Sequence, residues 1–418
     1  MSVDNNIPNA WVETTLGEVC EKMYSGGTPS TKRDDYYGGK IPWIRTQEVK
    51  FNFIREVKIK ITEKGFSNSS AKWIPENTVI IAMYGNSAGK VALSKVEATT
   101  NQACCNFVSD KNKSNPFFIF YNLLSRYKEI EGKANGAAQQ NLSVGVLKNL
   151  NINLPPIKEQ TAIAQILTAF DDKIENLQAQ NKTLETTAQT IFKEWFGKYQ
   201  IGDELPDGWR MFQMNELVEI INGYSYKGKD LVEESDEALV SLKSFDRNGG
   251  FQTRGFKPFK GNPKGIQEVQ IGDLIVAHTD LTQDAEVLGN PAFIFDNGGF
   301  KKMYITMDLV KVISIHKDIS SSFLYYLMKD RAFKGHCVGY SNGTTVLHLS
   351  KKAIPEYQVF LPIDLIKVKE FSEIANATTN KISLNKDELK YLKQTRDTLL
   401  PKLMSGQLRI KDFKETAV

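Results

Sequence analysis

The sequence predicts an α+β fold: two similar β-rich domains, separated by a long antiparallel two-helix coiled coil and related by a pseudo-two-fold axis. Three observations predict this fold. The 418-residue chain repeats itself once, each copy contains short strand-like runs, and each copy closes with a long heptad stripe. A long-period repeat of only two units indicates a duplicated domain rather than a solenoid, which needs three or more short units.

The repeat is clearest where matching dipeptides stand 207 positions apart. Asn135-Gly136 matches Asn342-Gly343, Leu142-Ser143 matches Leu349-Ser350, and Leu154-Pro155 matches Leu361-Pro362. Upstream the spacing drifts, as loops of different length would make it. There Pro8-x-x-Trp11 resembles Pro206-x-x-Trp209, and Val79-Ile-Ile-Ala82 resembles Leu274-Ile-Val-Ala277.

Within each copy, short apolar runs bounded by Gly, Pro, Asn and Asp indicate strands. Examples are residues 57–61, 78–83 and 309–315. Short helices are expected at 116–128 and 321–333. A strand-like segment ending in Leu-Pro follows in each copy, at 150–155 and 357–362. Each copy therefore looks mixed and mostly β until its last quarter.

The last quarter of each copy predicts a long amphipathic helix, because apolar residues step by alternating three and four positions. In the first copy the stripe is Leu167, Phe170, Ile174, Leu177, Asn181, Leu184, Ala188, Ile191 and Trp195. In the second it is Ala375, Thr378, Ile382, Asn385, Leu389, Leu392, Arg396, Leu399 and Leu403. Prolines precede both helices, and Gly197 and Gly406 follow them, as helix boundaries favour.

Neither stripe can be buried by its helix alone. Each helix could pack on its own domain, but the two stripes are better explained by pairing with each other. Asn181, Asn385 and Arg396 then fall on the seam, where polar residues fix register at a cost in stability. Because both copies run from domain to helix, antiparallel pairing gives one domain at each end of a rod about 55 Å long.

Composition narrows the class of protein. Lys and Arg exceed Asp and Glu only by 53 to 49, which permits a nucleic-acid partner but does not require one. The longest apolar run near the N-terminus is far shorter than the roughly 20 residues of a membrane span, and no signal peptide is recognisable. Four cysteines without Cys-x-x-Cys spacing favour a reducing cytoplasm, and the four histidines form no metal-binding pattern.

Several phrases, in this order and together with the duplication, resemble the specificity (S) subunits of type I restriction-modification systems over nearly the whole chain. They are Trp11-x4-Leu16-Gly17-Glu18, Ser25-Gly26-Gly27-Thr28-Pro29, Gly39-Lys-Ile-Pro-Trp43-Ile44-Arg45, Asn86-Ser-Ala-Gly89-Lys90-Val91 with Thr99-Thr-Asn101-Gln102, Leu154-Pro-Pro156-Ile157-x-Glu159-Gln160, and Leu399-Leu-Pro-Lys-Leu403-x-Ser-Gly406-x-Leu408. The second copy departs from them: Gly223-Tyr224-Ser225-Tyr226 replaces the Gly-Gly-Thr-Pro segment, and no Pro-Pro-x-x-Glu-Gln follows Phe360.

The resemblance implies a division into target recognition domain 1 (1–155), a central spacer helix (156–197), target recognition domain 2 (198–362), a C-terminal spacer helix (363–405) and a tail (406–418). Each recognition domain would read one half of a split, asymmetric site in double-stranded DNA, while the helices set the gap and dock two DNA-methyltransferase (M) subunits. Restriction/translocase (R) subunits would complete the complex. The chain itself would be non-catalytic and bind no cofactor, with S-adenosylmethionine, ATP and Mg in partner subunits.

Base reading in the major groove needs Arg or Lys for guanine and Asn or Gln for adenine. Polar loops at equivalent places in the two copies supply such side chains. In the first copy the candidates are Lys32, Arg33, Tyr36, Arg45, Gln47, Asn86, Lys90, Gln102, Gln139 and Gln140. In the second they are Tyr226, Lys227, Lys243, Arg247, Arg254, His278, Lys301, Lys302, Tyr340 and Asn342. The coiled-coil seam is assigned to Leu167, Phe170, Ile174, Leu177, Asn181, Leu184, Ile191, Trp195, Ile382, Asn385, Leu389, Leu392, Leu399 and Leu403.

Other classes fit less well. Gly85-Asn-Ser-Ala-Gly89-Lys90 is one residue too short for a phosphate-binding P-loop, and Val91 stands where Ser or Thr would hold magnesium. We interpret it as a turn that presents backbone N–H groups and Lys90 to a DNA phosphate. A stand-alone nuclease would need a carboxylate-lysine cluster, and the sequence contains no convincing one. The open alternative is a coiled-coil protein-interaction adaptor with two β-rich binding domains.

Overall fold

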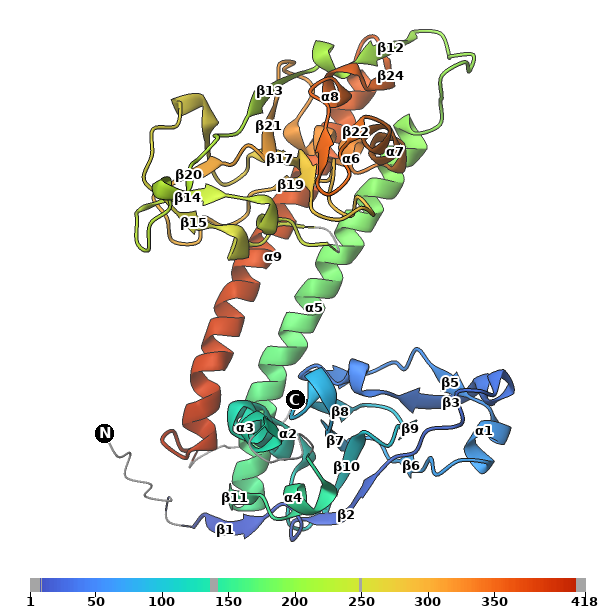
Figure 1. Ribbon diagram of the computed structural model, residues 1–418, viewed down its shortest axis with the longest axis vertical. Coiled ribbons are helices and arrows are strands. Elements are labelled where there is room, and N and C mark those ends of the chain that lie inside the picture. Colours follow the sequence, from blue (N-terminus) through green and yellow to red (C-terminus); the bar gives the residue numbers. More distant parts are fainter. Residues whose placement is uncertain (1–7, 9, 136–141, 248–249, 411–418) are drawn as a thin grey trace. The chain divides into compact units, whose positions relative to one another are not determined.

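The computed structural model describes residue 8 and residues 10–135, 142–247 and 250–410 (Figure 1). The chain divides into two compact units: unit 1 combines residues 1–175 and 390–418, and unit 2 is residues 176–389. Each unit thus contains a complete set of sheets and a segment of each long helix. The predicted five-part division follows the order of the sequence rather than these units, and it stays a prediction.

The described residues of unit 1 form three sheets. The largest has the order β2 (Cys20–Ser25), β10 (Cys104–Ser109), β7 (Val79–Ala82), β8 (Val91–Ser94) and β4 (Asn52–Ile54). A second has the order β5 (Lys60–Ile61), β3 (Tyr37–Ile44), β9 (Ala98–Thr100) and β6 (Trp73–Ile74). The third pairs β1 (Val12–Thr15) with β11 (Asn151–Leu154).

Unit 2 repeats this plan. Its first sheet has the order β13 (Val218–Asn222), β21 (Leu309–Ser314), β17 (Leu274–Ala277) and β19 (Pro291–Phe293). Its second has the order β15 (Lys257–Pro258), β14 (Glu237–Val240), β20 (Lys302–Ile305) and β16 (Glu268–Val269). β12 (Trp209–Gln213) pairs with β24 (Gln358–Pro362), and an additional sheet joins β18 (Thr279–Asp280), β23 (Leu347–Leu349) and β22 (Ser341–Asn342).

Strand directions agree between the units as well as strand order. In the first sheet, each of the three shared neighbour pairs is antiparallel in both units. In the second sheet, β3 and β9 are parallel, as are β14 and β20, and the flanking strands are antiparallel. Even the register is kept: the residue after Trp11 pairs with Leu154, and the residue after Trp209 pairs with Leu361. The predicted α+β fold class is confirmed, and the two units share the order and direction of their strands.

Short helices cover these sheets, and two long ones follow them. The short helices are α1 (Glu63–Ser67), α2 (Pro116–Ser125), α3 (Tyr127–Asn135), α4 (Val144–Lys148), α6 (Ser321–Met328), α7 (Arg331–Gly339) and α8 (Ala353–Glu356). Caps fix their starts: the Asn115 side chain accepts from two N–H groups of α2, and Ser320 accepts from Phe323 in α6. The long helices are α5 (Ile157–Phe196, 40 residues) and α9 (Ile366–Met404, 39 residues).

Each long helix packs into both cores. In unit 1, Ile163 and Leu167 near the start of α5 share a core with Leu400, Leu403 and Met404 at the end of α9. In unit 2, the opposite ends of the two helices meet. There Ala188, Phe192 and Phe196 at the end of α5 share a core with Val368, Phe371 and Ala375 at the start of α9. The helices therefore do not fold back each on its own half, and within each unit their segments run in opposite directions.

Burial follows the assigned coiled-coil seam. The buried members are Leu167, Ile174, Leu177, Ile382, Asn385, Leu389 and Leu403, and the half-buried members are Phe170, Asn181, Leu184, Ile191, Trp195, Leu392 and Leu399. Leu384 and Tyr391, which lie off the stripe, are 65% and 68% exposed. At the end of α5, Phe192 and Phe196 are buried more deeply than Ile191 and Trp195. The assignment of these residues to a coiled-coil seam stays a prediction.

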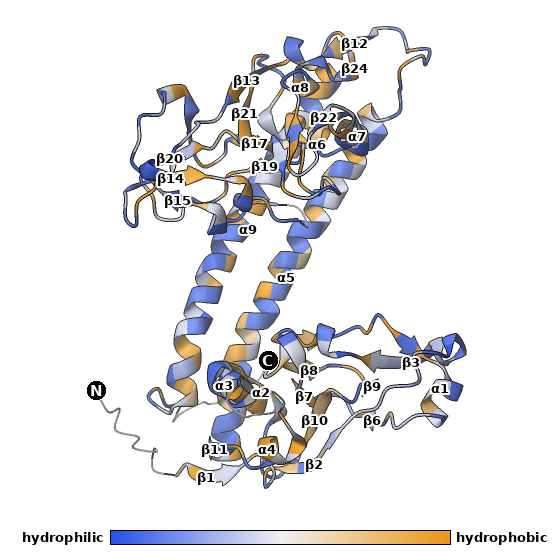
Figure 2. Ribbon diagram, viewed as in Figure 1, coloured by the Kyte–Doolittle hydropathy of each residue, from blue (hydrophilic) through white to orange (hydrophobic). Residues whose placement is uncertain are grey.

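Hydropathy colouring shows the same amphipathic character, since hydrophobic and hydrophilic residues alternate along both long helices (Figure 2). Within the described part of the chain, no helix combines the length and the apolar composition that a membrane span requires. The four cysteines are free thiols, and three of them are buried. Burial raises the pKa of Cys105 to about 12, so its thiol stays protonated at neutral pH.

Candidate nucleic-acid interface

In unit 1, four strands of the large sheet bring their connections to one end. Ser25, the last residue of β2, lies opposite Cys105 near the start of β10, and Cys104 lies opposite Ala82, the last residue of β7. The start of β8 lies beside the end of β7. Residues 26–28, 83–90 and 101–103 therefore meet at one end of this sheet, which we call the loop end of unit 1.

Unit 2 has an equivalent loop end. Asn222 closes β13 opposite Val310, and Ala277 closes β17 opposite Leu309, while β19 begins beside the end of β17. The parallel strands β14 and β20 finish together at Val240 and Ile305. The loop end of unit 2 therefore collects residues 223–226, 241–247, 278–290 and 306–308.

Three of the predicted first-copy residues, Asn86, Lys90 and Gln102, lie at the loop end of unit 1, and a fourth, Arg45, lies beside it. Arg45 follows β3 directly, and its position is set because Asn101 donates its N–H to the Ile44 carbonyl at 2.9 Å. The Gln102 side chain accepts a hydrogen bond from the Thr28 hydroxyl. Gln47 lies two residues beyond Arg45 in a 3₁₀ turn and is exposed.

The Arg45 guanidinium is not fully satisfied by the protein. The backbone N–H of Arg45 donates to the Glu48 carboxylate at 3.0 Å, which closes the turn after β3. Its buried Nε finds no hydrogen-bond partner among the described residues. A buried donor without a partner costs free energy unless a ligand supplies an acceptor. Arg45 is therefore the first-copy residue best prepared to receive a base edge or a phosphate.

Lys32, Arg33 and Tyr36 form a separate cluster at the other end of β3. Arg33 donates to both carboxylate oxygens of Asp35, at 2.9 and 3.0 Å, and its guanidinium lies 5.1 Å from the Tyr36 ring centroid. Lys64 also donates to Asp35, and the two cations hold the pKa of that carboxyl well below its usual range. Tyr36 is buried. The structure therefore does not bring these three residues together with Arg45.

The glycine-rich segment is a turn between β7 and β8. Gly85 and Gly89 take positive φ angles of +67° and +79°, which favour glycine. The N–H groups of Ala88, Gly89 and Lys90 donate to carbonyls within or beside the turn. These three N–H groups are thus already used within the protein, and the expectation that other backbone N–H groups of the turn face a phosphate stays a prediction. The Lys90 side chain stays half-exposed and Asn86 is exposed.

In unit 2, the additional sheet places two second-copy candidates around one strand. Thr279 and Asn342 both pair with His348, and Leu349 donates its N–H to the His278 carbonyl at 2.9 Å. His278 and Asn342 therefore lie on opposite sides of β23. Lys243 follows β14, and Lys243, Arg247 and Arg254 line one cavity of the loop end.

His278 is half-buried, and its pKa is lowered. Burial is the largest cause, and the nearby Lys351 and His348 add to it. Because the ordinary value is about 6.5, the imidazole is neutral at pH 7. A neutral imidazole has one donor and one acceptor nitrogen, so His278 can recognise a base edge but contributes no charge to phosphate binding.

Other second-copy candidates already bind side chains of this protein or lie away from the loop end of unit 2. Lys301 pairs with Asp236 at 2.7 Å, and Lys301 and Lys302 lie at the start of β20, away from its loop-end residue Ile305. Three further candidates contact other side chains of unit 2. Tyr226 accepts from Lys257 at 2.7 Å, Tyr340 donates to Glu356 at 2.9 Å, and Arg247 pairs with Glu286 at 3.1 Å, while Lys227 is exposed. Gln139 and Gln140 lie outside the described residues.

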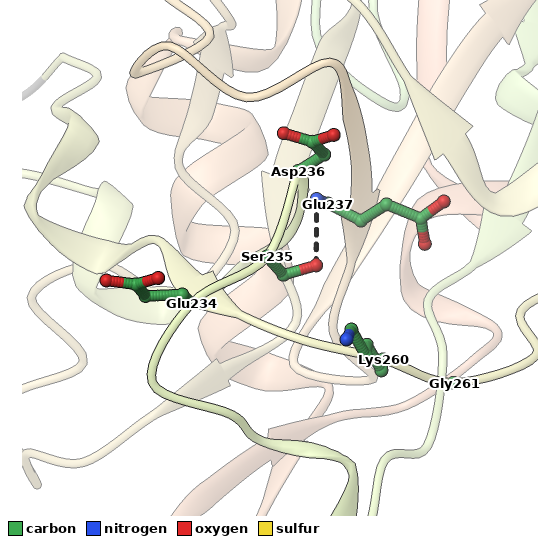
Figure 3. A pocket seen from close by; sticks show the side chains of 6 residues that line it. All are labelled: Glu234, Ser235, Asp236, Glu237, Lys260 and Gly261. Atoms are coloured by element: carbon green, nitrogen blue, oxygen red, sulfur yellow. Dashed lines mark hydrogen bonds between the residues drawn. The ribbon is translucent and has the colours of Figure 1, made fainter.

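A pocket at the start of β14 has the opposite charge. It is lined by Glu234, Ser235, Asp236, Glu237, Lys260 and Gly261. Figure 3 shows the three carboxylates pointing in different directions, so they do not converge on one ion. Among the described residues, no group of three or more His, Cys, Asp or Glu side chains could hold a metal. Three carboxylates repel phosphates, which makes this pocket unsuitable for nucleic acid.

The Glu159-Gln160 phrase has an internal role in unit 1. Glu159 accepts from Trp11 Nε1 at 3.2 Å and from two nitrogens of Arg409, at 2.7 and 3.0 Å. The fully buried Gln160 donates to the carbonyls of Lys113 and Pro155 and accepts from the Asn115 N–H. These bonds attach the start of α5 to the first domain, which explains why the phrase stands at that junction.

Sequence reasoning does not select two parts of the loop ends, Thr28 in unit 1 and residues 281–290 in unit 2. Thr28, which orients Gln102, has no base-matching side chain and so was not selected. Residues 281–290 are not selected because the residue that fixes their backbone is Asp280, whose carboxylate accepts from the N–H groups of Thr282, Val287 and Leu288. A carboxylate does not suit a DNA phosphate. A signal was present: the connection after Val79-Ile-Ile-Ala82 is five residues shorter than the one after Leu274-Ile-Val-Ala277.

Comparisons with known proteins show which proteins this chain is similar to. A family model described as the type I restriction modification DNA specificity domain matches residues 8–186. The type I restriction enzyme MjaIX specificity subunit of Methanocaldococcus jannaschii is 26% identical over 433 residues, covering 97% of this chain and 95% of that protein. The EcoR124I/EcoR124II specificity subunit of Escherichia coli is 33% identical over 163 residues, covering 38% of this chain and 40% of that protein.

A solved structure supports the fold. The crystal structure of a type I restriction-modification S subunit from M. genitalium has a TM-score of 0.61 and 20% sequence identity, covering 96% of this chain and 98% of that chain. At this identity, the likeness shows the fold alone.

Proposed function

Because this chain belongs to the family of type I restriction-modification specificity subunits, we propose that its two β-rich domains each read one half of a split, asymmetric site in double-stranded DNA. In this proposal the chain supplies sequence recognition and no catalysis. Two DNA-methyltransferase subunits dock on it, and restriction/translocase subunits complete the assembly. S-adenosylmethionine, ATP and Mg belong to those partners, and the complex acts in the cytoplasm.

One observation carries the proposal: two loop ends of matching topology present different base-matching side chains. The first offers Arg45, Asn86, Lys90 and Gln102, and the second offers Lys243, Arg254, His278 and Asn342. Arg and Lys suit guanine, and Asn and Gln suit adenine. A duplicated scaffold with unlike reading residues is what recognition of two unlike half-sites requires.

The long helices are proposed to set the unread gap. A helix of 40 residues spans about 60 Å, which exceeds one turn of DNA, about 34–36 Å. Each helix contributes residues to both cores, so a change in the length of either helix would act on both domains. The half-sites would then lie on the same face of the duplex, offset by one helical turn or somewhat more.

The test is to assemble the chain with its methyltransferase partner and measure binding to the motif found by mapping methylated adenines. Arg45→Ala is expected to weaken recognition of the first half-site roughly 10- to 100-fold, the equivalent of losing about 1–3 kcal/mol at one base contact. Arg254→Ala is expected to do the same at the second half-site. Binding should also fall steeply with salt.

Lys301→Ala is the matched control, because this exposed cation lies away from the loop end of unit 2. It should leave recognition of both half-sites unchanged. A wild-type complex that binds random DNA as well as the mapped motif would overturn the proposal and leave the adaptor alternative standing.

A further inference from the structure

The connection between equivalent strands differs in length between the units. Eight residues link β7 to β8 in unit 1, whereas thirteen link β17 to β19 in unit 2. The shorter connection is a tight turn held by its own backbone bonds. The longer one forms β18 and then residues 281–290, which we call the 281–290 loop. The connection in unit 2 therefore contains an element that the described connection of residues 83–90 in unit 1 lacks.

Asp280 holds the 281–290 loop from within. This carboxylate is 2% exposed. One oxygen accepts from the N–H and hydroxyl of Thr282, both at 2.8 Å, and the other accepts from the N–H groups of Val287 and Leu288, at 2.6 and 3.1 Å. Burial opposes the charged form, but these bonds outweigh it and lower the pKa of Asp280. The start and the end of the loop are thus tied to one side chain.

Lys334 on α7 holds the same loop from the other side. Its ammonium donates to the carbonyl of Leu288 at 2.5 Å, to the carbonyl of Glu286 at 3.4 Å and to the Asn290 side chain at 2.9 Å. The N–H groups of residues 287 and 288 therefore face a carboxylate, while carbonyls of residues 286 and 288 face an ammonium. Gln283 adds a third attachment, donating to the Thr344 carbonyl at 2.7 Å.

The fixed loop presents an apolar side chain in a cavity that is lined by both cations and carboxylates. Leu281 is 66% exposed and lines the same cavity as Lys243 and Arg254. Among the described residues, neither Lys243 nor Arg254 forms an ion pair, whereas Glu286 in the same cavity is paired with Arg247. In the major groove, an apolar side chain contacts the 5-methyl group of thymine, and cations beside it contact phosphates or guanine.

We propose that the 281–290 loop is the specificity-determining element of the second domain, with Leu281 contacting a base and Asp280 and Lys334 as positioning residues. This inference rests on the proposed function. A loop ordered before binding does not lose conformational entropy when it meets DNA, so more of its contact energy separates the correct base from the wrong one. The recognised feature is a base edge with an exposed methyl group.

The experiment uses the assembled complex and duplexes that carry every single-base change in either half-site. Asp280→Asn places an NH₂ group against backbone N–H donors at one of its two oxygen positions. It is expected to reduce discrimination within the second half-site about 10-fold or more while discrimination within the first stays unchanged. In cells, the methylated motif should lose bases from its second half and keep its first half and its gap.

Leu281→Ala is the second variant, because an exposed side chain can be shortened without disturbing the core. It should reduce discrimination at one or two adjacent positions of the second half-site. Ile271→Ala is the matched control, since Ile271 lies in the same unit, is 53% exposed and precedes β17, at the end of that strand opposite the loop end. The control should leave every position unchanged.

The outcomes separate this inference from the proposed function. If the wild-type complex reads two half-sites but Leu281→Ala and Asp280→Asn both keep second-half discrimination within twofold, the loop inference is wrong and the proposed function stands. If Asp280→Asn unfolds unit 2, as circular dichroism would reveal, the Leu281→Ala result alone decides. If the wild-type complex shows no sequence preference, the proposed function itself fails.

Discussion

The side-chain amide of Asn385 on α9 donates a hydrogen bond to the side-chain oxygen of Asn181 on α5, at 2.8 Å within unit 2. Asn385 is fully buried, and its own side-chain oxygen has no partner among the described residues. A half-satisfied buried amide costs stability, so this pair serves to fix the register of the two helices rather than to strengthen them.

Replacing Asn181 alone should destabilise unit 2. Asn181→Leu leaves the buried Asn385 amide without an acceptor, which should lower the free energy of unfolding by about 1–3 kcal/mol. The double variant with Asn385→Leu removes both polar groups and should be as stable as the wild type or more so. Urea denaturation of all four proteins in a double-mutant cycle measures the coupling. Additive effects of the two changes would contradict the account.

An ion pair between α5 and α9 in unit 1 should, unlike the asparagine pair, contribute to stability. Arg396 on α9 donates to Asp171 on α5 at 2.5 Å, and Tyr121 on α2 donates to the same carboxylate at 2.7 Å. Arg396→Met leaves a mostly buried carboxylate without its cation and should cost about 3 kcal/mol. Denaturant titration with Arg396→Lys as the control checks this, because lysine keeps the charge. Equal stability of the Met and Lys variants would argue against the pair.

The lowered pKa of His278 predicts a loss of stability in acid. Because the unfolded chain binds a proton at about pH 6.5 and the folded chain does so only at lower pH, the contribution of His278 is present above pH 6.5. It is lost progressively as the pH falls from there through the lower pKa of the folded chain. The free energy of unfolding of the wild type should therefore fall between pH 7.5 and 5.5. His278→Gln should flatten this profile. A profile unchanged by the substitution would show that His278 titrates alike in both states.

Much of the fold could be predicted from the sequence because periodicity reports local geometry. The heptad stripe marks the buried faces of α5 and α9, and the 207-residue repeat corresponds to strand pairs that keep the same register in both units. The exception is the end of α5, where Phe192 and Phe196 turn into the core of unit 2. Packing against β-strands and α6, rather than heptad spacing, decides which face is buried there.

The candidate site could be predicted only in part, because residue type does not reveal a partner. Arg33 and Lys301 have the right chemistry for DNA, but Asp35 and Asp236 already hold them, and Asp236 is 65 residues from Lys301 in sequence. Asp280 has the wrong chemistry for phosphate and yet organises the loop end of unit 2. Such roles depend on contacts that only the folded chain brings together.

The central claim is that the helices set the distance between two independent readers, and mapping the methylated motif after a matched deletion tests it most directly. Removing residues 178–184 and 382–388 takes one heptad from each helix around the Asn181–Asn385 pair. Seven residues shorten a helix by about 10 Å, so the account predicts the same two half-sites with a gap shorter by up to about three base pairs. An unchanged gap, or altered half-site sequences, would contradict it.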